Sequence, residues 1–171
     1  MKKEEFKFKL NELSKDKKVV YIDESGFVEN MDRTHGYSLK GVPCGGLKLQ
    51  NQHIRTNVIG ALQENKLVHC MAINSSINSI VFKSWFTHLA QNLPQPSVLV
   101  LDNASFHKAK DIEKIAQSFG HDLLYLPPYS PDLNPIEKMW ANLKKLKTKF
   151  ICSTSDLFSK FSNHFFHHNY F

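Results

Sequence analysis

Three acidic residues occupy positions in the sequence that are typical of active-site residues in proteins built around a β-sheet. Asp23 follows the apolar run "VVYI", Asp102 follows "SVLVL", and Glu137 lies at the start of a helical pattern. In open α/β sheets, ligands bind outside the carboxyl ends of the strands. If the strands that end at Asp23 and Asp102 are parallel neighbours, their carboxylates lie side by side at that edge. Two close negative charges favour a bound cation, and hard oxygen ligands predict Mg²⁺ or Mn²⁺.

Each aspartate also has an ordinary structural explanation. Asp23, in "DESG", could cap a turn, and Asp102, in "DNASFH", could cap the helix that follows it. Glu24 lies beside Asp23, but successive side chains of a strand point to opposite faces, so Glu24 ranks below Asp23 as a ligand. The residue types alone leave both interpretations of each aspartate open.

A stiff segment with four prolines, "LPPYSPDLNPIEKMW" at 126–140, precedes and contains Glu137. Asn134 fits the Ncap position of the next helix and Glu137 fits N3, so the glutamate could bond back to the cap amide in a capping box. The alternative is that Glu137 faces the sheet edge where Asp102 lies. The prolines would then hold that end of the helix in place at little entropic cost.

The remaining pattern predicts the elements that must position these acids. A hairpin is expected at Glu64-Asn65, between the β-rich runs 54–63 and 66–74. The strands at 97–102 and 122–126 flank a helix, which makes a βαβ unit with parallel strands. The other expected elements are a leading helix at 4–14, a strand at 19–23, an extended piece at 33–40, and helices at 78–92, 108–119 and 135–150.

Length and composition limit the class of protein. The chain has 171 residues, 42% of them hydrophobic, which suits a single core. We predict a connector helix at 1–18, a catalytic domain at 19–150, and a C-terminal tail or helix at 151–171.

The net charge of +6 is compatible with a polyanionic partner such as nucleic acid. Three scattered cysteines, no secretory signal and no apolar run of about 20 residues indicate a reduced, cytoplasmic protein without a membrane span.

Three segments carry a resemblance to a known family. "VVYIDESGF", "LVLDNASFHK" and "LPPYSPDLNPIEKMWANLKK" together resemble the catalytic domain of DDE transposases, and 34 residues (103–136) separate Asp102 from Glu137. The spacing is most similar to that of bacterial insertion-sequence (IS six-thirty type) transposases of the mariner superfamily. "RTHGYSLKG", 33–41, resembles the family's Arg…Gly-Trp segment, with Tyr37 in place of the more usual tryptophan.

The resemblance implies an α/β, ribonuclease H-like fold: a mixed five-stranded sheet, three antiparallel strands then a parallel βαβ unit, flanked by helices. It implies that Asp23, Asp102 and Glu137 hold two Mg²⁺ or Mn²⁺ ions. The implied activity is metal-dependent cleavage of DNA and its strand transfer during transposition. The implied partners are the DNA of the element ends and target, bound by a homodimer.

Other residues near the acids have weaker signals. Asn103 and His107 could touch substrate or a metal-bound water, or could stabilise the turn after the strand. Lys138 and the lysines that follow it could track phosphates, or could form a solvated helix end. Trp140 is expected in the core from its helical spacing. The histidines of the tail and Cys152 have no recognised zinc spacing.

Transposases of this type usually carry helix-turn-helix modules ahead of the catalytic domain, and the first acid here is already at position 23. A second reading frame joined to an upstream helix-turn-helix frame, a decayed remnant, and an isolated fragment are all compatible with this. Two rival functions remain: a ribonuclease H-like or resolvase-like nuclease, and a non-catalytic DNA-binding or assembly module.

Overall fold

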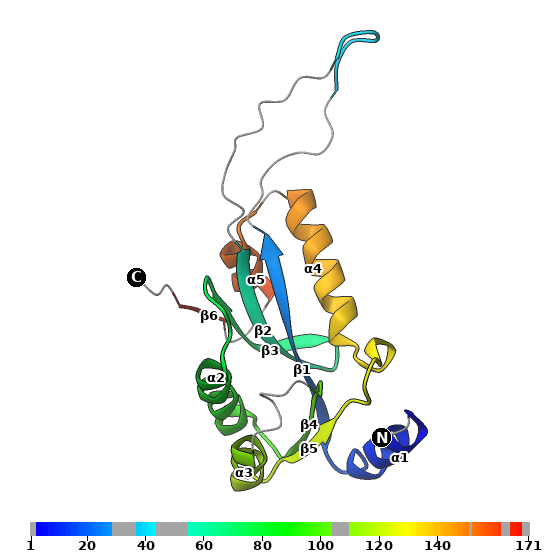
Figure 1. Ribbon diagram of the computed structural model, residues 1–171, viewed down its shortest axis with the longest axis vertical. Helices are drawn as coiled ribbons and strands as arrows, with labels where there is room; N and C mark the ends of the chain where they lie inside the picture. The colour runs from blue at the N-terminus through cyan, green and yellow to red at the C-terminus, as the bar shows by residue number, and fades with distance from the viewer. Residues whose placement is uncertain are drawn as a thin grey trace.

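A mixed six-stranded sheet runs through the protein (Figure 1). The computed structural model describes residues 3–28, 37–43, 55–103, 110–150, 152–161 and 165–168. The strand order is β5-β4-β1-β2-β3-β6. The strands are β1 Lys18–Val28, β2 Arg55–Gln63, β3 Lys66–Ile73, β4 Ser97–Leu101, β5 Asp122–Tyr125 and β6 Phe165–His168.

The first five strands confirm the predicted topology. β1, β2 and β3 pair antiparallel in chain order. β4 then lies parallel to β1 on its other side, and β5 lies parallel to β4. The β2–β3 hairpin turns at Glu64 and Asn65, whose φ angles of 49° and 64° suit a tight turn with both central residues left-handed.

β1 is longer than the sequence pattern predicts. The predicted strand ends at Asp23 because "ESG" resembles a break, but β1 continues to Val28. The physical reason is the neighbouring strand: β2 pairs with β1 from Tyr21 to Val28, so the backbone of this segment has ladder partners. Asp23 therefore lies inside a strand, and only the parallel partner β4 ends beside it.

Within the described ranges, five α-helices cover the two faces of the sheet (Figure 1). α2 and α3 pack on one face, where their side chains meet Val20, Ile22 and Leu99. α4 and α5 pack on the opposite face, with Trp140 and Phe158 over β1, β2 and β3. The helices are α1 Lys3–Leu13, α2 Ser79–Asn92, α3 Lys110–Ser118, α4 Ile136–Phe150 and α5 Thr154–Phe161, with a short 3₁₀ turn at Pro131–Leu133.

The C-terminal segment contains an element that the sequence pattern does not indicate. After α5 the chain adds β6, which pairs parallel with β3 from Cys70–Phe165 to Ile73–His168. Only four residues form this strand, and the aromatic and histidine run there has no clear period of two.

The described helices include none that is both long and apolar enough to cross a membrane.

α1 packs against the sheet beside β4 and β5. Phe6 is 1% exposed and shares a core cluster with Val98, Val100, Leu124 and Leu126. Phe8, on the same helix, is 67% exposed. The helix thus buries one side only, and its packing contributes to the stability of the sheet edge.

We expect Phe6→Ala to lower the free energy of unfolding by about 3 kcal/mol, because it leaves a cavity in this cluster. Phe8→Ala is the matched control, with an expected change within about 0.5 kcal/mol. Urea unfolding of both variants measures the difference. Equal effects of the two substitutions would show that α1 is not part of the folded core.

Candidate active site

The strand register brings the two aspartates together. Tyr21 of β1 pairs with Val100 of β4 in the parallel ladder. Asp23 lies two residues further along β1, and Asp102 directly follows the end of β4 at Leu101. Tyr21 and Val100 both have side chains on the face that carries α1 and α4, and side chains two residues apart share a face. Both carboxylates therefore lie on the α4 side of the sheet, where β4 ends.

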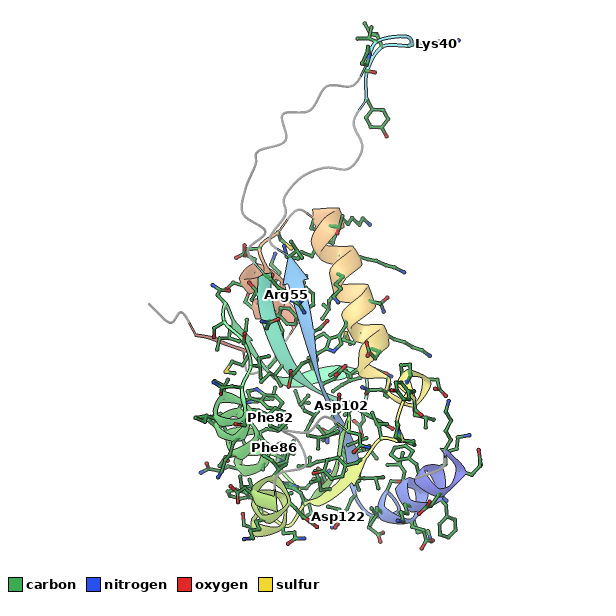
Figure 2. The ribbon with its side chains drawn as sticks, viewed as in Figure 1. Lys40, Arg55, Phe82, Phe86, Asp102 and Asp122 are labelled. Carbon is green, nitrogen blue, oxygen red and sulfur yellow. The ribbon has the colours of Figure 1, made fainter. Side chains whose placement is uncertain are left out.

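One pocket of about 370 Å³ contains all three acids that the sequence singles out. It lies between the end of β4, the proline segment and the start of α4; Figure 2 labels Asp102 near the foot of that helix. The described lining residues include no lysine or arginine. The lining consists of Asp23, Asp102, Asn103, Leu126, Pro127, Pro128, Tyr129, Ser130, Pro131, Asn134 and Glu137.

The capping-box alternative for Glu137 is wrong. The backbone N–H of Asn134, which a capping box would offer to the glutamate, donates instead to the carbonyl of Pro131 at 3.0 Å. That bond closes the 3₁₀ turn Pro131–Leu133. The α-helix begins two residues later, at Ile136, and exposed Glu137 lines the pocket with the aspartates.

The surroundings of Asp23 disfavour its charged form. The pKa of Asp23 is raised from 3.8 to about 7, first by burial and then by the negative charges of Glu137 and Asp102. Hydrogen bonds from the Glu24 backbone and the Trp140 side chain act in the opposite direction. The negative charges of Glu137 and Asp102, which help to raise this pKa, also favour a cation bound beside Asp23.

Trp140 is in the core, as predicted, and it also reaches the site. Its ring is 1% exposed, and its indole Nε1–H donates to Asp23 Oδ2 at 3.2 Å. The helical spacing alone indicates only the buried ring. The polar contact with an acid 117 positions away depends on the packing of α4 over β1.

The donor set fits a hard divalent cation. Besides the three carboxylates, the amide oxygen Asn134 Oδ1 is buried without a hydrogen-bond partner among the described residues. Carboxylate and amide oxygens are ligands that Mg²⁺ and Mn²⁺ prefer. In the described part of the chain, no three acidic, histidine or cysteine side chains already converge on one ion position. Binding therefore requires these side chains to turn toward a common point.

Of the other residues that the sequence singles out, only some line this pocket. Asn103 is exposed and lines the pocket, whereas Lys138 is exposed on α4 and does not line it. Tyr37 is fully exposed and does not line the pocket. His107 and residues 33–36 lie outside the described residues.

Tyr129 is a lining residue that the sequence analysis missed. Its side chain is 99% exposed. Its backbone φ angle is 53°, a value that residues other than glycine rarely adopt. Its position within "PPYSP" is the only sequence signal for it.

Comparison with known proteins identifies relatives of this arrangement. Residues 18–157 match the family model described as DDE superfamily endonuclease. No sequence of a curated protein is similar enough to be matched to the chain. Among solved structures, the Mos1 strand transfer complex is similar with a TM-score of 0.71 at 18% identity, covering 92% of this chain and 49% of that chain.

Two further Mos1 structures have the same fold. The catalytic domain of Mos1 mariner transposase is similar with a TM-score of 0.63 at 13% identity, covering 92% of this chain and 74% of that one. The Mos1 paired-end complex with Mn has a TM-score of 0.62 at 16% identity, with 94% and 48% covered. The chain thus has the ribonuclease H-like fold of that catalytic domain, and it spans about half the length of the Mos1 chains in the complexes.

The raised pKa of Asp23 predicts how pH affects the stability of the metal-free protein. Because the folded pKa of about 7 exceeds the ordinary value of 3.8, the native state holds the proton more tightly, and stability is lost as the pH rises from about 4 to 7. Asp23→Asn should therefore stabilise the protein at pH 8 by up to about 4 kcal/mol and have little effect near pH 4. Urea unfolding in EDTA at both pH values measures this, and a destabilised variant at pH 8 would contradict it.

Proposed function

Because the chain belongs to the DDE superfamily of endonucleases, we propose that it is the catalytic domain of a transposase that cleaves DNA and transfers the strands. The observation that carries this proposal is the shared pocket of Asp23, Asp102 and Glu137. Their order, their spacing and their position beside the sheet edge match the three acids of the resemblance described above. The similarity of fold to the Mos1 catalytic domain supports the same activity.

Asp23, Asp102 and Glu137 are the residues that would hold two divalent ions, and the match to a Mos1 complex with Mn supports this. When bound, the metal supplies an activated oxygen nucleophile and stabilises the leaving oxygen of a phosphodiester. The burial of Asp23 removes much of the water around its carboxylate, so its charge would act more strongly on a bound cation. The proline segment fixes the start of α4 and hence the position of Glu137.

DNA is the proposed substrate and partner. Lys138 and Lys145 are exposed on α4, which begins at the pocket, so a backbone that enters the site could continue along these lysines. Asn103, which lines the pocket, would contact the DNA strand next to the scissile phosphate. The protein would act as a homodimer on the paired ends of a bacterial insertion sequence and on target DNA, with a helix-turn-helix partner or fusion recognising the ends.

The cytoplasm is the proposed location. Cys152, which lies between α4 and α5, is a free thiol. Reduced cysteines are the usual state in that compartment.

We expect Asp102→Asn to reduce Mn²⁺-dependent nicking of supercoiled plasmid DNA by at least about 100-fold, because the pocket loses one of its charged ligands. Its affinity for the same DNA in a gel-shift assay should be unchanged. Asp132→Asn is the matched control: Asp132 is an exposed acid in the same proline segment, paired with Lys3 at the surface. It should nick like the unaltered protein.

Nicking that survives Asp102→Asn would exclude this site as the active centre. Cleavage of an RNA–DNA hybrid in preference to plasmid DNA would favour the ribonuclease H-like alternative. An unaltered protein that binds DNA and fails to bind Mn²⁺ would favour the non-catalytic alternative.

Mn²⁺ affinity should rise as the pH increases from 6 to 8. The ion competes with the proton on Asp23, whose pKa is about 7, so deprotonation frees the ligand. Isothermal titration calorimetry at pH 6, 7 and 8 measures the affinity. An affinity that is constant over this range, or falls, would show that Asp23 is not a ligand.

A further inference from the structure

The indole of Trp140 connects helix α4 to the acid on strand β1. Trp140 lies three residues after Glu137, so both side chains project from neighbouring positions on one side of α4. Glu137 lines the pocket, while Trp140 Nε1–H donates to Asp23 Oδ2 at 3.2 Å. One helix therefore supplies one acid of the pocket and a hydrogen-bond donor for another.

The ring is held in place by aromatic neighbours. Phe27 meets it nearly at a right angle, with ring centroids 6.2 Å apart and an interplanar angle of 80°. Phe158 of α5 makes a second edge contact, with centroids 6.1 Å apart and an angle of 60°. Such contacts restrict the ring to one orientation, and in this orientation its N–H points at Asp23.

Gly60 makes this close approach possible. It pairs with Asp23 across the β1–β2 ladder, directly beneath the ring. A Cβ built at this position would overlap Trp140 Cη2 and lie 2.9 Å from Cζ2. Any residue other than glycine at position 60 must therefore displace the indole, and glycine inside a strand often marks such an approach.

We propose that Trp140 is a positioning residue: its indole N–H holds the Asp23 carboxylate in the orientation that binds metal, and Gly60 admits the ring that makes this contact. The inference rests on the proposed metal-dependent function, because it assigns Trp140 its role through Asp23. Groups that orient a metal-binding carboxylate typically change metal affinity by about 10-fold to 100-fold when they are removed.

Trp85 provides an internal control for the experiment. The chain has only two tryptophans. Trp85 is buried in the cluster on the opposite face of the sheet, and its Nε1 has no hydrogen-bond partner among the described residues. Trp85→Phe therefore removes the same atoms from the core as Trp140→Phe, without touching the site.

The first measurement uses the full chain labelled with ¹⁵N and titrated with Mg²⁺. Its spectrum should contain two indole N–H signals, which Trp140→Phe and Trp85→Phe assign. The Trp140 signal should shift as Mg²⁺ binds Asp23, and the Trp85 signal should stay in place. If neither signal moves while Mg²⁺ binding is detected by calorimetry, the proposed contact is excluded, whether or not the variants fold.

The second measurement is Mn²⁺ affinity by calorimetry. Trp140→Phe keeps an aromatic ring and should bind Mn²⁺ about 10-fold more weakly, whereas Trp85→Phe should bind as the unaltered protein does. Gly60→Ala should show a similar loss although it retains Trp140. Gly26→Ala, on the adjacent strand, is its matched control, because the three atoms nearest to a Cβ there all belong to the flexible side chain of exposed Arg55.

Two failures are distinguishable. If the unaltered protein binds no Mn²⁺, the proposed metal-dependent function is overturned, and this inference falls with it. If the unaltered protein binds Mn²⁺ and Trp140→Phe binds it equally well, only the role of Trp140 is overturned.

Discussion

Burial of the Asp23 carboxylate beside two other acids is the constraint on which the rest of the site depends. The pKa of this group is raised to about 7 by burial, Glu137 and Asp102. A protein does not keep such a group for stability, because its charged form disfavours the native state above neutral pH. A divalent cation bound in the pocket would reverse this effect, because it would replace the repulsion between carboxylates with attraction to one centre. On the proposed function, metal binding would thus relieve the instability that the pocket causes.

The surrounding structure explains how acids so distant in sequence meet. The parallel pairing of β1 with β4 brings Asp23 near the end of β4, which Asp102 directly follows. The 3₁₀ turn and the prolines then direct the chain so that α4 starts at the pocket, with Glu137 in its first turn. α4 is held over the sheet by the cluster around Trp140. The packing of this helix therefore contributes to the geometry of the site as well as to the core.

Much of this arrangement could be predicted from the sequence, because it depends on local signals. The continuous apolar runs indicate the buried strands, and Glu64-Asn65 indicates the hairpin turn. The prolines forbid a helix before Pro135. Asp102 and Glu137 follow from their positions at the ends of these elements, and Asp23 follows from the apolar run before it, in each case together with the family motifs. Their roles as metal ligands remain a prediction.

Other features depend on contacts that local patterns do not encode. The extension of β1 past Asp23 needs the backbone of β2 as a partner. The four-residue strand β6 exists only through pairing with β3. The capping box looks correct in the sequence, but the carbonyl of Pro131 takes the Asn134 amide. The hydrogen bond from Trp140 to Asp23 and the need for glycine at position 60 appear only once α4 lies on the sheet.

A crystal of the protein grown with Mn²⁺ and measured at the manganese absorption edge tests the central claim most directly. We expect anomalous density inside the pocket, at about 2.1 Å from carboxylate oxygens of Asp23 and Asp102, with Glu137 turned toward it. Anomalous density elsewhere, or none at all in the pocket at saturating Mn²⁺, would contradict it.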